Sequence, residues 1–397
     1  DVTSEERSAY FKMRRAIIRV DFNVPMDSQK NVLDNSRIKA AKSTILKVIN
    51  DGGSVILMSH LGRPKGKDLN LSLRYIIPEL EKILNHKVLF AEDSMGPATQ
   101  AISKNLNSGE ILLLENLRFY PEETNGDEDF AKQLSSYADC YINDAFGTAH
   151  RAHASTTVIA KFFKNNKFSG HLLSKEVEAI KKVLETGKKP ILAILGGAKV
   201  SSKITIIESI MNKVDEIIIG GGMSFTFIKA LGGETGDSIC EDDKLGLAIS
   251  ILEKAKQKGI TVHLPVDVVC SKEFSDKGDK KVHNINSIPS NWQGLDAGPQ
   301  SRENFAVVVK RANTILWNGP VGVFELNSFS NGTISLGQSI IESTKKGAFS
   351  LVGGGDSVSA VKKFNFQDKV SYVSTGGGAM LESLEGKKLP GIVALSN

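Results

Sequence analysis

The sequence is poor in cysteine and lacks any long apolar run. The three cysteines are Cys140, Cys240 and Cys270; an odd number without C-x-x-C spacing argues against a disulfide framework or a zinc site. This favours a reducing compartment, and we expect a cytoplasmic protein. No apolar stretch reaches membrane-spanning length, and the polar start DVTSEERSAY does not resemble a signal peptide. We therefore expect no membrane association.

The chain also lacks a large excess of positive or negative charge. Lys and Arg number 50 against 45 Asp and Glu, which gives a net charge of +5. The chain has no basic tail and no basic patch laced with aromatic residues, so we expect no nucleic-acid partner. A hydrophobic fraction of 41% is typical of a globular protein, and 397 residues exceed one ordinary core, which predicts two domains.

Short apolar runs alternate with longer amphipathic stretches throughout the chain. This alternation predicts an α/β fold with parallel sheets covered by helices on both faces. The expected strands are 16–20, 54–58, 111–114 and 139–142 in the first half, and 190–195, 216–219, 261–264, 314–317, 349–352 and 370–373 in the second. The clearest helical patterns cover 39–50, 73–84 and 245–258.

One strong helical pattern, LLSKEVEAIKKVLE at residues 172–185, lies near the middle of the chain. Its apolar residues are expected on one face: Leu173, Val177, Ile180 and Leu184. Ser174 is placed to cap the start. We interpret 172–187 as a hinge helix that joins a first domain, 1–171, to a second domain, 188–375.

The predicted strands of the first half all end in polar or cationic residues. The residues concerned are Asp21, Asn23, His60, Arg63, Arg118, His150, Arg151 and His153, with Arg37 nearby. Ligands of open α/β sheets bind beyond the carboxyl ends of the strands, and arginine forks match carboxylate and phosphate oxygens. The pattern therefore indicates an anion site, with solvated surface charge as the alternative. A metal site at the two histidines of HRAH would lack a nearby third ligand.

The strand ends of the second half are instead rich in glycine, as in LGGAKVSSK, IIIGGGMS, WNGPVGVFE, VGGGDSVS and STGGGA. Glycine lets backbone N–H groups approach an anion. Lys199 and Lys203 are expected on one face of the helix that LGGA opens, with an anion between them. Asp356 is placed to hold magnesium and Glu325 to accept hydrogen bonds from a ribose hydroxyl. These features favour a nucleotide, although neither G-x-x-x-x-G-K-[ST] nor G-x-G-x-x-G occurs.

Two other classes of protein stay open on these grounds. A non-catalytic anion receptor explains the cationic strand ends but not the glycine-rich second half. A Rossmann dehydrogenase would need the dinucleotide-binding pattern that is absent here.

Ten motifs, taken in order, closely resemble those of phosphoglycerate kinase: RVDFNVP, SHLGRP, ENLRF, NDAFGTAHRAH, GGAKV, GGGMSFTF, GLDAGP, WNGPVGVFE, GGGDS and STGGGA. The resemblance covers about Ile17 to Asn397; residues 1–15 do not match the family's usual opening. It implies a glycolytic kinase that transfers a phosphoryl group reversibly between Mg-ATP and the carboxylate of 3-phosphoglycerate, giving ADP and 1,3-bisphosphoglycerate. A catalytically inactive relative is a further alternative, although every matched charged position is present.

The family also implies a monomer with two Rossmann-like domains that bend at a hinge, and a C-terminal segment, 376–397, that packs back onto the first domain. Its cofactor is Mg²⁺. Because the acceptor carboxylate is already ionised at neutral pH, no general base is expected.

The family's functional residues can be carried over position by position. Phosphoglycerate binding falls on Asp21, Phe22, Asn23, Arg37, His60, Leu61, Gly62, Arg63, Arg118, His150 and Arg151. Nucleotide binding falls on Gly197, Lys203, Gly221, Gly294, Asn318, Pro320, Glu325, Gly354, Gly355, Asp356 and Ser357, with Asp356 also holding the metal. Arg37 and Lys199 are implied to meet the transferred phosphoryl group, and Gly376 and Gly377 to form an anion loop. Ser357 stands where the family often has threonine and keeps the hydroxyl expected to contact phosphate.

Overall fold

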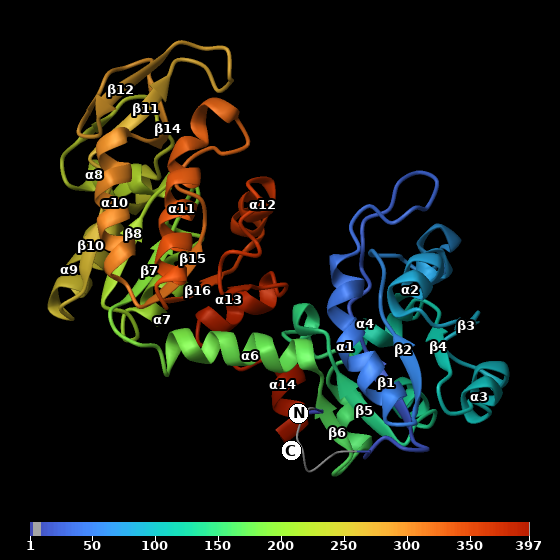
Figure 1. The fold of residues 1–397 in the computed structure, drawn as a ribbon. Helices are drawn as coiled ribbons and strands as arrows, with labels where there is room; N and C mark the ends of the chain where they lie inside the picture. Colours follow the sequence, from blue (N-terminus) through green and yellow to red (C-terminus); the bar gives the residue numbers. More distant parts are fainter. Residues whose placement is uncertain (3–8, 397) are drawn as a thin grey trace. The chain divides into compact units, whose positions relative to one another are not determined.

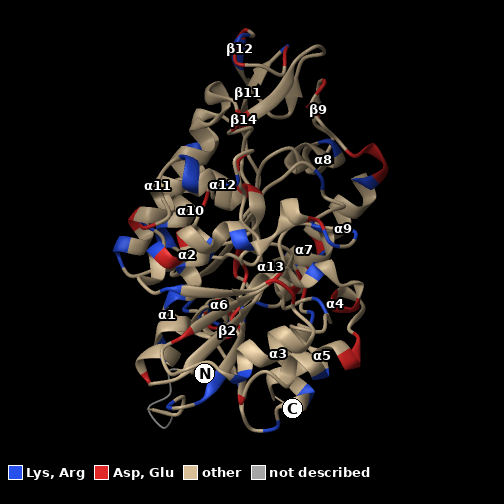
Figure 2. Cartoon of the chain, turned by 90° about the vertical axis from the view of Figure 1, so that its right-hand side faces the viewer, with Lys and Arg blue, Asp and Glu red and all other residues tan. Residues whose placement is uncertain are grey.

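The computed structural model describes residues 1–2 and 9–396, which divide into two compact units (Figure 1). Unit 1 comprises the described residues up to Val177 and those from Lys388 onward, and unit 2 comprises Glu178–Lys387. Helix α6 (His171–Leu184) begins in the first unit and ends in the second. Lys, Arg, Asp and Glu are interspersed over both units, in keeping with the small net charge (Figure 2).

Unit 1 is built on a six-stranded, wholly parallel sheet in the order β3-β4-β2-β1-β5-β6. Its strands are β1 (Arg15–Arg19), β2 (Ser54–Met58), β3 (Val88–Ala91), β4 (Ile111–Leu114), β5 (Cys140–Asn143) and β6 (Lys167–Ser169). Its other helices are α1 (Ser36–Asn50), α2 (Ile77–Leu84), α3 (Pro97–Lys104), α4 (Pro121–Asn125), α5 (Glu128–Ser135) and α14 (Pro390–Ser396). Short 3₁₀ helices are η2 (Leu69–Leu71), η3 (Leu73–Ile76), η4 (Leu117–Phe119), η5 (Phe146–Thr148) and η6 (Val158–Phe162).

Both faces of this sheet are buried, which explains why its strands are continuous apolar runs rather than alternating ones. Ile18 and Leu57 pack into a cluster with residues of α1 and α2. Ile17 and Ile56, which point to the opposite face, join a cluster with α5, η6 and α14. Helix α14, from the end of the chain, thus belongs to the core of unit 1.

Unit 2 repeats this architecture with a second six-stranded parallel sheet, in the order β10-β8-β7-β15-β16-β17. Its strands are β7 (Ile191–Leu195), β8 (Glu216–Ile219), β10 (Thr261–His263), β15 (Thr314–Asn318), β16 (Phe349–Val352) and β17 (Tyr372–Val373). Its helices are α7 (Ile204–Ile210), α8 (Met223–Ala230), α9 (Leu245–Gln257), α10 (Pro299–Arg311), α11 (Asn331–Lys345), α12 (Gly355–Lys363) and α13 (Gly378–Leu384), with η7 (Asp242–Lys244) and η8 (Asn327–Phe329). The predicted α/β class with two parallel sheets is confirmed.

Two small sheets in unit 2 were not predicted from the sequence. One is antiparallel, in the order β12-β11-β14, formed by β11 (Asp267–Ser271), β12 (Lys280–Asn284) and β14 (Gln293–Ala297). The other pairs β9 (Glu234–Thr235) with β13 (Ser287–Ile288). Strands β3 and β6 of unit 1 were also missed, since both are short and only partly buried.

The C-terminal segment divides between the units. Helix α13 contacts α7 and belongs to unit 2, whereas α14 contacts β6 and η6 in unit 1. Only the part of residues 376–397 that begins at Lys388 therefore lies with unit 1.

The start of α6 differs from the prediction. Ser174 lies inside the helix, and its hydroxyl is 2.7 Å from the Ser169 hydroxyl. The cap is Asp144, whose Oδ1 accepts hydrogen bonds from the N–H groups of Leu172 (3.0 Å) and Leu173 (3.2 Å). The predicted apolar face is also wrong in part, because the Val177 side chain is exposed. The buried residues of α6 are Leu173, Glu176, Ala179 and Val183.

The Asp144 carboxyl is fully buried, and burial raises its pKa to about 7. The folded chain therefore binds this proton more tightly than the unfolded chain, whose pKa is about 4. The stability that the protonated carboxyl contributes is fully present below pH 4, falls as the pH rises to 7, and does not change further above pH 7.

Asp144→Asn keeps the oxygen that caps α6 and removes the group that ionises. We expect its free energy of unfolding, relative to wild type, to rise by about 2–4 kcal/mol between pH 4 and 7.

Urea titrations followed by circular dichroism at several pH values measure this difference. The exposed Asp129→Asn in α5 is the matched control, and its curve should stay parallel to wild type. If the free energy of unfolding of Asp144→Asn also ran parallel to that of wild type across this pH range, the pKa of the buried carboxyl would be the same in the folded and unfolded chain.

Candidate active site

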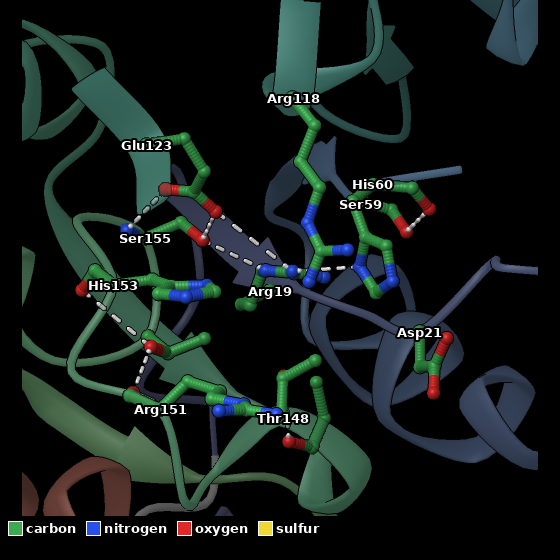
Figure 3. A network of polar contacts seen from close by, with 12 residues as sticks. Arg19, Asp21, Ser59, His60, Arg118, Glu123, Thr148, Arg151, His153 and Ser155 are labelled. Carbon is green, nitrogen blue, oxygen red and sulfur yellow. Dashed lines mark hydrogen bonds and ion pairs between the residues drawn. The ribbon is translucent and has the colours of Figure 1, made fainter. Parts of the chain in front are cut away.

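A cluster of cationic side chains gathers at the carboxyl edge of the unit 1 sheet, as the strand-end pattern predicts (Figure 3). His60 follows β2, Arg118 lies in η4 after β4, and Arg151 follows η5 after β5. Burial lowers the pKa of the Arg118 guanidinium, and the positive charges of Arg19, Arg63 and Arg151 lower it further. So many like charges repel one another, and an anion placed among them would relieve that repulsion.

Arg37, at the start of α1, joins the cluster through the loop after β1. Its Nη1 donates to the Asn23 carbonyl (2.5 Å) and lies 3.5 Å from the Asp21 carboxylate. Asn23 Oδ1 accepts a hydrogen bond from Gly62 N–H (2.9 Å), which ties this loop to the loop after β2. Arg37 stays 41% exposed, so its remaining donors are open to a ligand.

The other residues predicted to bind phosphoglycerate in unit 1 differ in how much of each residue a ligand can reach. Phe22 and Leu61 are buried in the apolar core, so only their backbone is available to a ligand. Gly62 contributes its backbone, because its carbonyl accepts a hydrogen bond from Arg118 (3.3 Å).

His150 is half-buried beside His153, which is not among the residues that the family resemblance assigns to phosphoglycerate binding. Burial and the surrounding cations lower the pKa of His153 to about 4, so it is neutral at physiological pH.

Unit 2 presents two adjoining cavities, of about 500 and 290 Å³, that share Gly197, Ala198 and Asp356 in their linings. Every residue implied to bind nucleotide lines one or both of them. The larger is lined by Gly197, Gly221, Gly294, Pro320, Glu325 and Asp356, and the smaller by Gly197, Lys203, Asn318, Gly354, Gly355, Asp356 and Ser357.

The smaller cavity is more polar than the larger one, and a short network of hydrogen bonds holds its lining in place. Lys203 Nζ donates to Asn318 Oδ1, and Asn318 Nδ2 donates to the Gly353 carbonyl (2.9 Å). Gly354 has a φ of +100°, and a Cβ there would lie 2.7 Å from Asn318 Nδ2. Only glycine therefore brings the backbone this close to Asn318 at the start of α12.

Comparison with known proteins decides the family. A profile of the phosphoglycerate kinase family matches residues 7–387. A phosphoglycerate kinase of Porphyromonas gingivalis is 49% identical over 97% of this chain and 98% of its own length. A cytosolic phosphoglycerate kinase of Arabidopsis thaliana is 48% identical over 98% and 97%. The chain belongs to the phosphoglycerate kinase family.

Solved structures of the family agree with this assignment. The phosphoglycerate kinase of Coxiella burnetii superposes with a TM-score of 0.90 at 41% identity, covering 97% of both chains. That of Pyrococcus horikoshii superposes with a TM-score of 0.81 at 30% identity, covering 97% of this chain and 96% of the other. The chain is thus a glycolytic kinase that transfers a phosphoryl group reversibly between ATP and 3-phosphoglycerate. The receptor and dehydrogenase alternatives are set aside.

Within this phosphoglycerate kinase fold, the two lysines expected to share a helix face do not. Lys199 lies in the loop after β7 with an exposed side chain, and α7 begins only at Ile204, after Lys203. The buried hydroxyl of Ser357 accepts a hydrogen bond from Gly319 N–H (2.5 Å), which ties α12 to the loop after β15. This bond uses a lone pair of the oxygen, so the O–H donor expected to contact phosphate is not consumed by it.

Gly376 and Gly377 lie outside the linings of both cavities. They stand at the start of α13, where Gly376 N–H donates to Ser374 Oγ (3.0 Å) and Gly377 has a φ of +46°.

The apolar wall of the larger cavity was missed by the sequence reasoning. It includes Phe225, Val268, Phe274, Ile285 and Leu326. Such a wall is suited to the flat face of an aromatic base. The only signal in the sequence was the pair of phenylalanines in GGGMSFTF, which is indistinguishable from a buried helix.

Asp356 fits a magnesium ion bound together with a nucleotide. It is exposed, it lies in the first turn of α12, and it is part of the lining of both cavities. Among residues 1–2 and 9–396, no three His, Cys, Asp or Glu side chains converge as a preformed metal site. A single carboxylate is what Mg²⁺ uses when substrate phosphates and water complete its coordination.

Proposed function

We propose that the cationic cluster of unit 1 binds 3-phosphoglycerate. The observation that carries this proposal is the convergence of charged side chains from four strand ends around His60 and Arg118. Arginine forks bind phosphate and carboxylate oxygens bidentately. Asp21 and Asn23 lie beside Arg37 and can accept a hydrogen bond from the substrate hydroxyl.

The two cavities of unit 2 bind ATP or ADP in this proposal. The apolar wall holds the base, Glu325 accepts hydrogen bonds from the ribose, and Lys203 with the backbone of 354–355 holds phosphate. Asp356 holds Mg²⁺, which neutralises phosphate charge when bound. Isothermal titration with ADP in the presence and absence of Mg²⁺ tests this arrangement.

The transfer requires positive charge that stabilises the phosphoryl oxygens, and it requires no general base. A carboxylate oxygen of 3-phosphoglycerate attacks the γ-phosphorus, the bond from that phosphorus to the β–γ bridging oxygen breaks, and ADP leaves with the electron pair. The carboxylate is already ionised, so no proton moves. We assign to Arg37 and Lys199 the stabilisation of the charge that spreads over the transferring oxygens.

The direct test of this site is a coupled assay of ATP formation from ADP and 1,3-bisphosphoglycerate, with chelation of Mg²⁺ as a control. We expect activity that disappears with the metal. Activity that persists under chelation would refute the proposed use of Asp356.

A second prediction concerns Arg63, which is exposed at the rim of the cluster beside Arg118. Arg63→Ala removes one phosphate-binding fork, and we expect the KM for 3-phosphoglycerate to rise about tenfold, or about 1.4 kcal/mol. Isothermal titration with ADP should give an unchanged Kd. Lys65→Ala, an exposed cation of the same loop, is the control. Equal loss in both variants would mean that only general positive charge matters.

We further propose a monomeric, cytoplasmic enzyme whose units approach each other when both ligands bind. The proposed compartment follows that of the Arabidopsis thaliana relative, which is named as cytosolic. None of the described helices is both long and apolar enough to cross a membrane. The proposed hinge movement follows from direct transfer between ligands held by different units, and small-angle scattering with both ligands should show a smaller radius of gyration than without.

A further inference from the structure

Arg19 is a charged residue at the buried end of β1, where it follows the apolar residues Ala16, Ile17 and Ile18. Its side chain is completely inaccessible to solvent. Nε donates to the Ser155 hydroxyl (2.8 Å) and Nη1 to the Val20 carbonyl (2.5 Å). Nη2 lies 3.0 Å from Nδ1 of His60 (Figure 3). The guanidinium is therefore held on three sides, and one of them is a residue of the proposed substrate site.

The charge of Arg19 is balanced beneath the site by Glu123, which is equally inaccessible and lies 3.8 Å from Nη2. Glu123 accepts hydrogen bonds from the Ser155 backbone N–H (2.8 Å) and hydroxyl (2.6 Å). Ser155 thus connects the two charges directly. A buried ion pair with its hydrogen bonds satisfied fixes geometry, and removing one partner would leave a costly buried charge.

The contact between Arg19 and His60 has only one possible direction. A guanidinium carries donors and no acceptor, so His60 Nδ1 must accept the hydrogen bond. Nδ1 then carries no proton, and the imidazole is neutral with its single proton on Nε2. Nε2 makes no hydrogen bond to any residue that the structure describes, which leaves this N–H available to a ligand.

The titratable groups with the largest effect on His60 oppose its protonation. They are Arg19 in β1, Arg118 in η4, Arg37 in α1 and His153 after η5. The two nearby carboxylates, Glu123 and Asp21, are each paired with one of these arginines, Glu123 with Arg19 and Asp21 with Arg37. Burial, followed by these neighbours, lowers the pKa of His60 well below its ordinary value. Protonation would also place an Nδ1–H group against an N–H group of Arg19.

We propose that Arg19 is a positioning residue that fixes His60 in the neutral form with the proton on Nε2, so that His60 donates this N–H to the acidic substrate. This inference rests on the proposed 3-phosphoglycerate site. Without Arg19 the ring is free to move its proton to Nδ1, which would present a lone pair to the anion. Loss of the Arg19 charge also raises the pKa of the ring, which would make substrate binding depend more strongly on pH.

The ring of His60 can be observed directly by ¹⁵N NMR of the free protein at pH 5–8. In wild type we expect Nδ1 to be unprotonated at every pH in this range, with no titration. The double variant Arg19→Met/Glu123→Gln removes both buried charges, so that neither is left alone. In it we expect the pKa of the ring to rise and part of the molecules to carry the proton on Nδ1, while burial and the remaining cations still hold the pKa below its ordinary value. Arg15→Met, at the other end of β1, is the control and should leave the ring unchanged.

Kinetics provide the second readout. We expect the double variant to raise the KM for 3-phosphoglycerate about tenfold at pH 8. This defect relative to wild type should shrink as the pH is lowered and more of the rings become cationic, while the Kd for ADP is unchanged. Arg19→Lys, which keeps a donor and the charge, should restore part of the affinity.

A wild-type ring that titrates between pH 5 and 8, or that carries its proton on Nδ1, would overturn the inference. So would a double variant whose ring changes as expected but whose KM is unaltered. Because the NMR experiment needs no substrate, it separates this failure from failure of the proposed site, which would appear as absent binding of 3-phosphoglycerate to wild type by isothermal titration.

Discussion

Lys199→Ala should reduce kcat by about a hundredfold or more while leaving the Kd for ATP nearly unchanged. The structure separates two lysines that the sequence places four residues apart. Lys203 is half-buried, and its ammonium is hydrogen-bonded to Asn318 at the floor of the smaller cavity. Lys199 is exposed in the loop after β7. A cation that is not anchored in the nucleotide cavity can interact with charge that develops only during transfer, which raises kcat rather than affinity.

Lys203→Ala is expected to show the opposite pattern to Lys199→Ala, with its main effect on ATP affinity. It leaves the Asn318 amide oxygen without its partner and removes a charge from the phosphate cavity, so we expect a higher Kd for ATP. The exposed Lys213→Ala is the control for a simple loss of positive charge from unit 2. Single-turnover kinetics with saturating ATP, together with isothermal titration, separate the two effects. Loss of ATP affinity with normal turnover at saturation in Lys199→Ala would make it a binding residue only.

The sequence predicts the frame of the fold closely because the parallel strands are buried on both faces. The limits of β2, β4, β8 and β16 agree with the predicted runs residue for residue. The rule that ligands bind beyond strand ends then brings His60, Arg118 and Arg151 together without further information. Strand β12, KKVHN, was missed because it is largely exposed and has no apolar face to reveal it.

Other features depend on tertiary contacts that no local pattern contains. Helix α7 begins after Lys203, not at LGGA, and the backbone at Gly196 packs against the loop after β15. The cap of α6 comes from Asp144, far from Ser174, and Gly170 is needed because a Cβ there would lie 2.1 Å from the Asp144 carboxylate. Arg19 did leave a signal, a charge inside an apolar strand, but its partners Glu123 and Ser155 lie more than a hundred residues away.

Asp356→Asn should impair the use of Mg-ATP without weakening the binding of metal-free ATP, which makes it the sharpest test of the metal assignment. Without its charge the first turn of α12 loses a Mg²⁺ ligand, and we expect kcat/KM for Mg-ATP to fall by about a hundredfold. The same carboxylate repels bare phosphates, so removing it should leave the Kd for metal-free ATP equal or lower.

Activity measured over a range of Mg²⁺ concentrations should show a higher requirement in the variant, and isothermal titration with and without a chelator gives the two affinities. Asp368→Asn, an exposed acidic residue of the same unit, controls for the change in net charge. If both forms of ATP were weakened equally, Asp356 would be acting on the nucleotide or on α12 itself, since a metal ligand affects only the form that carries the metal.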